Sequence, residues 1–265
     1  MRVFVQAISV LGPGLAGWEA SAPILAGDAP YVTTELALPP LTVLPPAERR
    51  RTGISVKLAL SVGLQALEAV AMPRETIATV FTSSGGDGQV IHEICQSLAT
   101  AERDVSPTRF HNSVHNAAAG YWGIALRSHA ASTSLCGYDW SFAAGLLEAA
   151  TQCLFDRKPV LLVSYDAPYP EPLNGARPIV GALGVALLLG SEPNASDIAE
   201  VEIALDTTPG NISRMASDEL EILRANNPTG RSLPVLSALA KRSGGEVILE
   251  YLDVGTIKLK LSFAR

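Results

Sequence analysis

The sequence is short of cysteines, of charged residues and of long apolar runs, and each shortage excludes a class of protein. Three cysteines in 265 residues, with no Cys-x-x-Cys pair, exclude a disulfide scaffold and argue against a structural zinc site. A net charge of −6 lacks the basic surface on which nucleic-acid binding depends. The best apolar run, residues 178–190, is shorter than the roughly 20 residues needed to span a bilayer. We therefore expect neither a nucleic-acid partner nor a membrane span.

What the chain does have is apolar sequence. Hydrophobic residues make up 48% and charged residues only 17%, enough for a large core and too little charge for a fully solvated surface. Part of the surface is therefore expected to be covered by a partner. Residues 1–5 carry one basic residue and no clear cleavage site after them. They predict a first β-strand in a cytoplasmic protein rather than a signal peptide.

Apolar periodicity predicts alternating strands and helices over the first 190 residues, which is typical of an α/β fold. Proline-rich residues 23–51 are expected to form an excursion without a long helix. The expected strands are 3–10, 77–81, 132–135, 159–164, 178–189, 198–205, 247–252 and 256–263. The expected helices are 55–71, 89–101, 116–130, 141–155, 218–225 and one beginning near Ser232.

Common cofactor and metal motifs are missing. The glycine-rich turn at residues 85–88 lacks the Lys-Ser/Thr of a phosphate-binding loop, and no Gly-x-Ser-x-Gly elbow occurs. His111 and His115 are spaced four apart, but the sequence indicates no third ligand. We therefore expect no cofactor and no metal.

The informative block runs from Phe110 to Glu148. Asn116-Ala-Ala-Ala-Gly120 opens a helix, a short strand follows at 132–135, and a turn at 136–140 leads into an apolar helix. This order resembles the β-ketoacyl synthases, specifically the short β-ketoacyl synthase-like N-terminal domain proteins. The resemblance covers residues 1–192 and does not extend beyond them.

The resemblance implies an α/β, thiolase-like fold, with the N-terminal half built and a shortened, atypical C-terminal part. Residues 1–192 would be the ketosynthase-like N-terminal domain. Residues 193–265 would be a short extension packed on the same domain.

Counting residues from the matched flanking positions places a carboxylate where a synthase has its nucleophilic cysteine. Counting forward from Asn116 and Gly120, and backward from Val160, gives Asp139 both times. A carboxylate cannot take over the work of a thiolate, which attacks a thioester and holds the acyl group. Two interpretations of Asp139 stay open: a helix N-cap, or a group that touches the partner or the tunnel.

The positions of the histidines also argue against catalysis by this chain. The resemblance implies two catalytic histidines downstream of the cysteine, whereas all four histidines here precede Asp139. We therefore expect no catalytic residue in this chain. The implied function is a non-catalytic, chain-length-factor-like partner of a complete β-ketoacyl synthase, in a heterodimer that serves fatty acid or polyketide synthesis, including aryl polyenes. The implied carrier of the acyl and malonyl groups is acyl carrier protein.

Three other hypotheses remain. Cys136, three residues before Asp139, could carry acyl groups in an active condensing enzyme, although we interpret it as a packing residue. Asp139 at the helix N-terminus could serve a malonyl decarboxylase. The chain could also be a scaffold that has no contact with a tunnel.

The apolar character of residues 111–147, whose only full charges are Arg127 and Asp139, predicts an obligate interface of roughly 2,000 Å² or more. The strand at 132–135 is expected to lie at the two-fold axis of the pair. The residues predicted for the interface or tunnel are Asn116, Ser132, Thr133, Ser134, Leu135, Asp139, Trp140 and Phe142.

Overall fold

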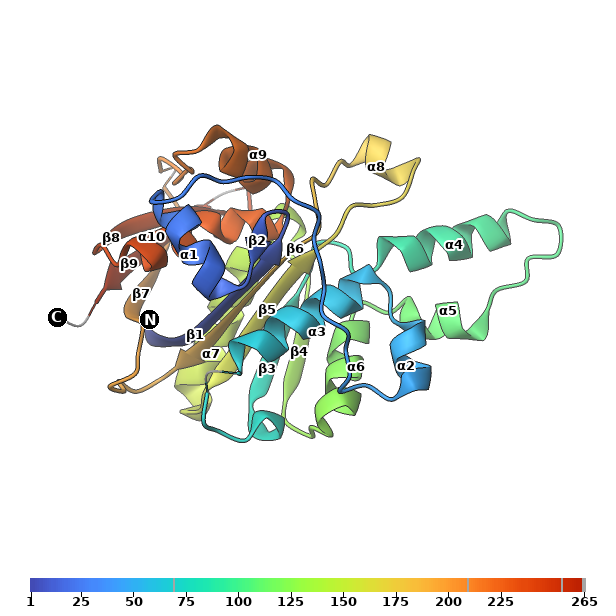
Figure 1. Ribbon diagram of the computed structural model, residues 1–265, viewed down its shortest axis with the longest axis horizontal. Coiled ribbons are helices and arrows are strands. Elements are labelled where there is room, and N and C mark those ends of the chain that lie inside the picture. Colours follow the sequence, from blue (N-terminus) through green and yellow to red (C-terminus); the bar gives the residue numbers. More distant parts are fainter. Residues whose placement is uncertain (69, 209, 254, 264–265) are drawn as a thin grey trace.

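A single mixed sheet organises the computed structural model, which describes residues 1–68, 70–208, 210–253 and 255–263 (Figure 1). Its strand order is β4-β3-β5-β6-β1-β7-β9-β8, with β2 paired to β1. The strands are β1 (Arg2–Gly12), β2 (Leu15–Ala16), β3 (Ala78–Thr82), β4 (Ser132–Leu135), β5 (Val160–Asp166), β6 (Leu183–Gly190), β7 (Ala199–Asp206), β8 (Gly245–Tyr251) and β9 (Gly255–Ser262).

Only β4, β3 and β5 run parallel to one another; the other pairings are antiparallel. The carboxyl ends of these three strands therefore meet at one edge of the sheet, where ligands and functional loops gather in α/β proteins. The strands β7, β9 and β8 continue the sheet beyond β1, so the C-terminal residues that sequence reasoning could not match belong to the same sheet.

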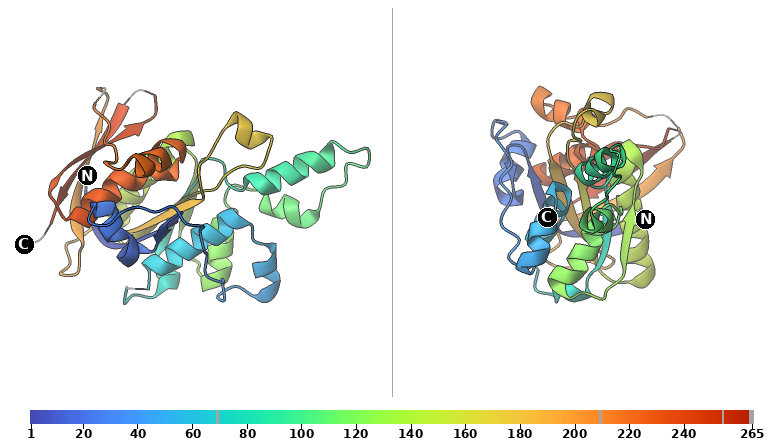
Figure 2. Two further views of the ribbon diagram at one scale, coloured as in Figure 1. Left: turned by 45° about the horizontal axis from the view of Figure 1, so that its top comes forward. Right: turned by 90° about the vertical axis from the view of Figure 1, so that its right-hand side faces the viewer.

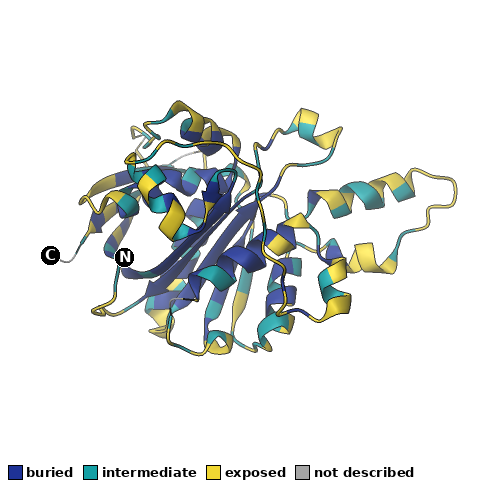
Figure 3. Ribbon diagram, in the orientation of Figure 1, coloured by how far each residue is buried: buried dark blue, intermediate teal, exposed yellow. Residues whose placement is uncertain are grey.

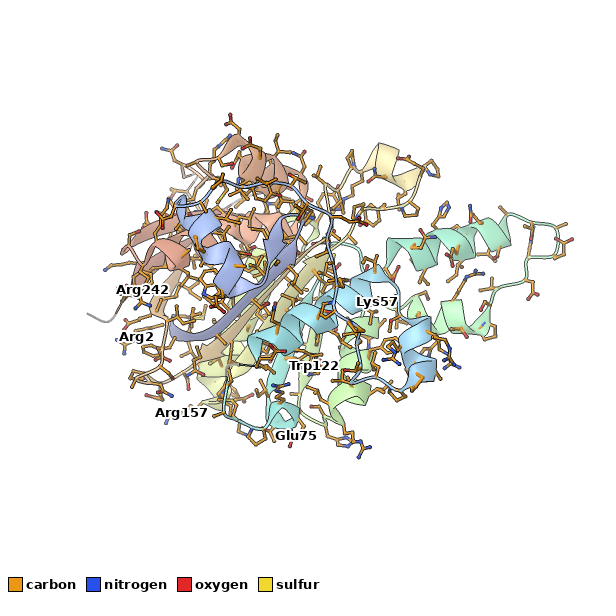
Figure 4. All side chains as sticks on the ribbon, in the orientation of Figure 1. Arg2, Lys57, Glu75, Trp122, Arg157 and Arg242 are labelled. Carbon is orange, nitrogen blue, oxygen red and sulfur yellow. The ribbon has the colours of Figure 1, made fainter. Side chains whose placement is uncertain are left out.

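Helices cover both faces of the sheet (Figure 2). The helix α3 packs on β1, β5 and β6, whereas α7 packs on β3, β5 and β6 from the other side. Trp122 of α6 lies between α6 and α3 and fills the space above Gly63 (Figure 4). The helices of the body are α1 (Trp18–Ala26), α2 (Pro46–Arg51), α3 (Ile54–Ala66), α6 (Ala117–Leu126), α7 (Ser141–Asp156), α8 (Leu173–Ala176), α9 (Asp218–Asn226) and α10 (Leu233–Lys241).

Burial from both sides explains the apolar runs in the sequence. All residues of β5 and β6 are buried, and these strands are dark blue in Figure 3. A strand covered on both faces needs apolar residues at every position rather than at alternate ones. The α/β class predicted from the sequence is confirmed.

Several element boundaries differ from the sequence prediction. The helix predicted at 116–130 ends at Leu126, because Arg127 adopts a left-handed φ of 53° and Ser128 N donates to Gly123 O. The helix predicted at 55–71 ends at Ala66, before Pro73, and Ala69 lies outside the described residues. The strand predicted at 178–189 begins at Leu183, because Gly181 has a φ of 65°.

One helical hairpin stands apart from the body. The helix α4 (Gly88–Leu98) and the helix α5 (Pro107–Asn112) pack against each other and project from the sheet in Figures 1 and 2. We call residues 88–112 the arm. No helix within the described part of the chain is long and apolar enough to cross a membrane.

Phe142 was predicted to lie at the interface or tunnel, but its side chain has no exposed surface and belongs to the central core. It lies on the face of α7 that packs against the sheet, so direct contact with a partner does not fit its burial.

Phe142→Ala should therefore lower the free energy of unfolding by about 3–5 kcal/mol, the usual cost of emptying a buried aromatic site. Urea unfolding monitored by circular dichroism measures it. Phe155→Ala, at a side chain of the same helix that is 87% exposed, is the matched control and should change stability by less than about 0.5 kcal/mol. Equal losses for the two variants would contradict this assignment of the core.

Candidate functional site

The turn between β4 and α7 holds Asp139, which register in the sequence led us to expect at the nucleophile position of a synthase. Residues Tyr138–Trp140 form a single 3₁₀ turn, η2, and Tyr138 has a left-handed φ of 54°. Ser141 Oγ accepts a hydrogen bond from Gly137 N at 3.0 Å and donates one to Tyr138 O at 2.7 Å. These bonds hold the strained backbone in place just before the helix.

Asp139 is not a helix N-cap, so that interpretation was wrong. The residue before α7 is Trp140, and no side chain caps the helix there. The extra turn η2 moves the Asp139 carboxylate away from the first amides of α7. Its partner is instead Arg177, whose Nη2 donates to Asp139 Oδ1 at 2.8 Å.

Arginines from two distant segments surround this carboxylate. The Arg177 guanidinium also stacks over the ring of Tyr138, 3.7 Å from its centroid. Arg231, in the 3₁₀ turn η3 (Thr229–Ser232), lies 3.9 Å from Asp139 Oδ2 and forms an ion pair with Glu250 of β8. Asp139 is thus held in place by Arg177, with Arg231 close to its second carboxylate oxygen.

Two cavities meet at Asp139 and Arg231. One of 540 Å³ extends toward Trp140 and Glu250, and one of 260 Å³ extends toward Arg177 and the end of α9. The C-terminal part of the chain therefore supplies walls of both. Sequence reasoning missed Arg231 and Glu250, because they lie where no motif could be matched and reach Asp139 only through tertiary folding.

A second polar cluster lies at the carboxyl ends of β3 and β5. Asp166 is 2% exposed and accepts hydrogen bonds from Ser84 N at 2.8 Å, Ser84 Oγ at 2.7 Å and Thr229 Oγ1 at 2.9 Å. A weaker bond comes from Ser83 Oγ at 3.3 Å. The cluster ties the loop after β3 to η3, and so fixes Arg231 two residues further on. Sequence reasoning gave no signal of this role for Asp166.

The buried carboxyl of Asp166 predicts a pH dependence of stability. Burial raises its pKa above the ordinary value, although the hydrogen bonds from Ser84, Thr229 and Ser83 oppose the rise. Its stabilising contribution is therefore complete below the pKa in the unfolded chain and is lost as pH rises through the pKa of the folded protein. Asn cannot ionise, so the stability of Asp166→Asn relative to the wild type should improve between about pH 4 and pH 7.

Urea unfolding at a series of pH values measures this difference, with Asp28→Asn at an exposed turn as the control. A relative stability of Asp166→Asn that falls as pH rises would contradict the assignment.

Cys136, interpreted as a packing residue, is exposed in the structure, so that interpretation was wrong. Its Sγ donates to Ser84 O at 3.1 Å, while His115 Nε2 lies 3.0 Å from Ser83 O. Within the described residues, neither contact joins the thiol to a histidine base. The described part of the chain also contains no group of three residues able to hold a metal ion, so His111 and His115 have no third ligand there.

Apart from the buried Phe142, the predicted interface residues lie along β4, at the start of α6 and beside the 540 Å³ cavity. Asn116, Ser132 and Ser134 line a hollow of 520 Å³ together with His115, Ala119 and Gly120. Thr133 and Leu135 alternate with these serines along β4, and Thr133 Oγ1 accepts from Gln152 of α7 at 2.8 Å. Trp140 lines the 540 Å³ cavity instead, beside Asp139. The strand β4 is one end of the sheet, and no strand among the described residues pairs with its outer edge.

A family model described as the N-terminal domain of beta-ketoacyl synthase matches residues 25–241, most of the chain. The chain belongs to the β-ketoacyl synthase N-terminal domain family. The matched region includes the arm, η2 with Asp139, and Arg231, and it stops before β8. Among curated proteins, none matches the sequence.

Solved structures resemble this β-ketoacyl synthase-family chain over almost its whole length. A chain of the ketosynthase ApeO in complex with its chain length factor ApeC, from Xenorhabdus doucetiae, is 21% identical with a TM-score of 0.73, and the match covers 99% of each chain. The ishigamide ketosynthase/chain length factor is 15% identical with a TM-score of 0.75 over 100% of each chain.

A third structure, a beta-ketoacyl synthase from Burkholderia phymatum STM815, is 10% identical with a TM-score of 0.67 over 100% of each chain. These likenesses show the fold, which is thiolase-like.

Proposed function

We propose that the chain is a non-catalytic, chain-length-factor-like subunit that pairs with a complete β-ketoacyl synthase and helps to bound its acyl tunnel. The pair would join acyl and malonyl groups carried on acyl carrier protein, in fatty-acid-like or polyketide synthesis of the aryl polyene type. Two of the similar structures are described as a ketosynthase with a chain length factor, which supports this class of function.

The observation that carries the proposal is the ion pair between Asp139 and Arg177. A synthase needs a thiolate at this position, which a helix N-terminus stabilises. Here a carboxylate stands before the helix and is held by Arg177 at 2.8 Å. Condensation also requires donors that stabilise an oxyanion, and the sequence has no histidine after His129.

The open edge of β4 supports pairing with another subunit. Thr79 N donates to Ala131 O, and Ser83 N donates to Leu135 O. Because a parallel ladder engages alternate residues, the backbone N–H and C=O groups of Ser132 and Ser134 point away from β3. These groups can hydrogen-bond to a strand of a partner subunit. An uncovered edge of this kind invites self-association.

The alternative is an active acyl-thioester enzyme that uses Cys136 or Asp139. Its one favourable observation is that Cys136 is exposed. Against it, the thiol donates to the carbonyl of Ser84, and no hydrogen bond among the described residues joins it to a histidine. The ion pair with Arg177 similarly leaves Asp139 engaged as a structural charge.

Co-expression tests the proposal. The tagged chain is produced with each complete β-ketoacyl synthase of the source genome, and size-exclusion chromatography with mass measurement gives the stoichiometry. We expect a one-to-one complex with one of these synthases, and self-association or aggregation of the chain alone. A stable monomer at about micromolar concentration that pairs with no synthase would overturn the proposal.

A further inference from the structure

The wall of the 540 Å³ cavity beside Asp139 carries two buried polar atoms that have no partner. Thr256 of β9 lines this cavity and is only 3% exposed, and its Oγ1 has no hydrogen bond within the described residues. Arg231 Nε, on the same lining, is likewise buried and unpartnered there. Native proteins leave few buried polar atoms unpaired, because each one costs free energy. The volume lies within the usual range of small-molecule pockets, so a bound ligand accounts for both atoms.

The hairpin of β8 and β9 places the Thr256 hydroxyl beside a carboxylate. Glu250 and Thr256 stand directly opposite each other in the antiparallel register, so their side chains emerge on one face of the sheet, about 5 Å apart at Cβ. Gly210 lies against Thr256 on that face. Lys258, the next residue of β9 on the same face, is paired with Asp206 at 2.5 Å. The hairpin therefore presents a carboxylate and a hydroxyl together to the cavity.

The charges around the cavity leave an excess of negative charge. Its described lining holds three carboxylates, Asp139, Glu250 and Asp253, and one guanidinium, Arg231. Arg177 reaches Asp139 from the adjoining cavity and cancels one more of these charges. One negative charge remains uncompensated, so the lining attracts a cation and repels an anion.

The hydrogen-bonding groups of the lining also favour a ligand that is rich in donors. An ionised carboxylate has about four acceptor positions, and the arginine contacts of Asp139 and Glu250 occupy only part of them. An ammonium group has three N–H donors and no acceptor, which complements such a wall. Trp140 and Ile212 line the same cavity and supply its apolar surface. The indole of Trp140 is also the aromatic ring that attracts cations best.

We propose that this cavity binds an organic primary amine in its ammonium form. Glu250 and Thr256 hold the ammonium group, and the apolar body of the amine packs against Trp140. The bound amine joins the hairpin of β8 and β9 to the turn η2. This inference goes beyond the proposed function, because it concerns a free small molecule and does not depend on pairing with a synthase.

Three probes that share one phenylethyl body test the class of ligand. Phenethylamine is a cation at about pH 7, hydrocinnamamide is neutral and hydrocinnamate is an anion. Surface plasmon resonance measures their binding to the full-length chain, immobilised through a tag at low density so that copies stay apart. Phenethylammonium should bind roughly ten-fold or more tightly than the other two. Equal or tighter binding of the amide or the carboxylate would overturn the choice of ligand, and no phenethylammonium binding up to about 10 mM would overturn the site.

Substitutions in the hairpin test the position of the site. Glu250→Gln should weaken phenethylammonium binding roughly ten-fold or more, because the carboxylate that faces the ammonium loses its charge. Thr256→Val removes only the hydroxyl and should weaken it about five-fold. The matched control is Glu246→Gln, at an exposed position of the same strand outside the cavity, and it should stay within about two-fold. Unchanged affinity of both cavity variants would place the probe elsewhere and overturn the proposal.

Hydrogen exchange of the wild-type chain supplies a readout that does not depend on how the variants fold. With saturating phenethylamine, the backbone amides of residues 255–257 should exchange more slowly than in the free chain. Protection confined to other parts of the chain would contradict the site. Failure of every synthase to pair with the chain would overturn the proposed function and leave this result unaffected.

Discussion

Ser134→Pro should abolish pairing with the synthase and leave the fold intact. The backbone N–H of Ser134 points away from β3, so proline removes no hydrogen bond of the β3–β4 ladder. It does remove the donor offered to a partner strand, and its ring blocks close approach. We expect binding to weaken roughly 100-fold or more, which corresponds to about 2.7 kcal/mol.

Ser134→Thr is the control for that prediction, because it keeps the backbone donor at the same position and is well suited to a strand. Its affinity should stay within about five-fold of the wild type. Far-ultraviolet circular dichroism of each variant checks the fold. Undiminished affinity of Ser134→Pro would show that β4 is not at the interface.

Condensation by the pair should depend on the nucleophilic thiol of the partner and not on the Cys136 thiol of this chain. Replacing the nucleophilic cysteine of the partner synthase by alanine should lower the rate roughly 1,000-fold or more, because no covalent acyl intermediate can form. Cys136→Ala in this chain should leave the rate within about three-fold, since the thiol only donates to the carbonyl of Ser84. Product formation from acyl and malonyl carrier protein measures both rates. A large loss with Cys136→Ala would favour the active-enzyme alternative.

Restoring a thiol at the aligned position should not restore catalysis. Asp139→Cys in the isolated chain should produce no condensation above background, because no histidine follows position 129 to stabilise the oxyanion. The same carrier-protein assay, with wild-type chain as the baseline, measures it. Measurable condensation by the isolated variant would show that the missing histidines have a substitute in this chain.

Regular elements near Asp139 could be predicted because their signals are local. The strand at 132–135 has the predicted bounds, and the helix predicted at 141–155 extends one residue further. Apolar periodicity is enough to predict such elements, because it does not depend on contacts with distant residues. The end of α6 and the start of β6 were predicted less well, since Arg127 and Gly181 adopt left-handed conformations that leave no mark in the periodicity.

The arrangement of the site could not be predicted, because it depends on contacts between residues that are far apart in the sequence. Asp139 was found by register, but its partners Arg177 and Arg231 lie 38 and 92 positions later in the chain. The buried Asp166 binds Thr229, 63 positions away. Periodicity and motif spacing carry no information about such pairs, so the ion pairs and the buried cluster emerged only from the structure.

The most direct test of the central claim is to weigh both chains of the pair after exposure to an acyl carrier protein thioester. Intact-mass spectrometry reads each subunit separately. The proposed function predicts an acyl adduct on the partner synthase and an unchanged mass for this chain, whose aligned position holds Asp139 paired with Arg177. An acyl adduct on this chain, mapped to Cys136, would contradict the non-catalytic assignment.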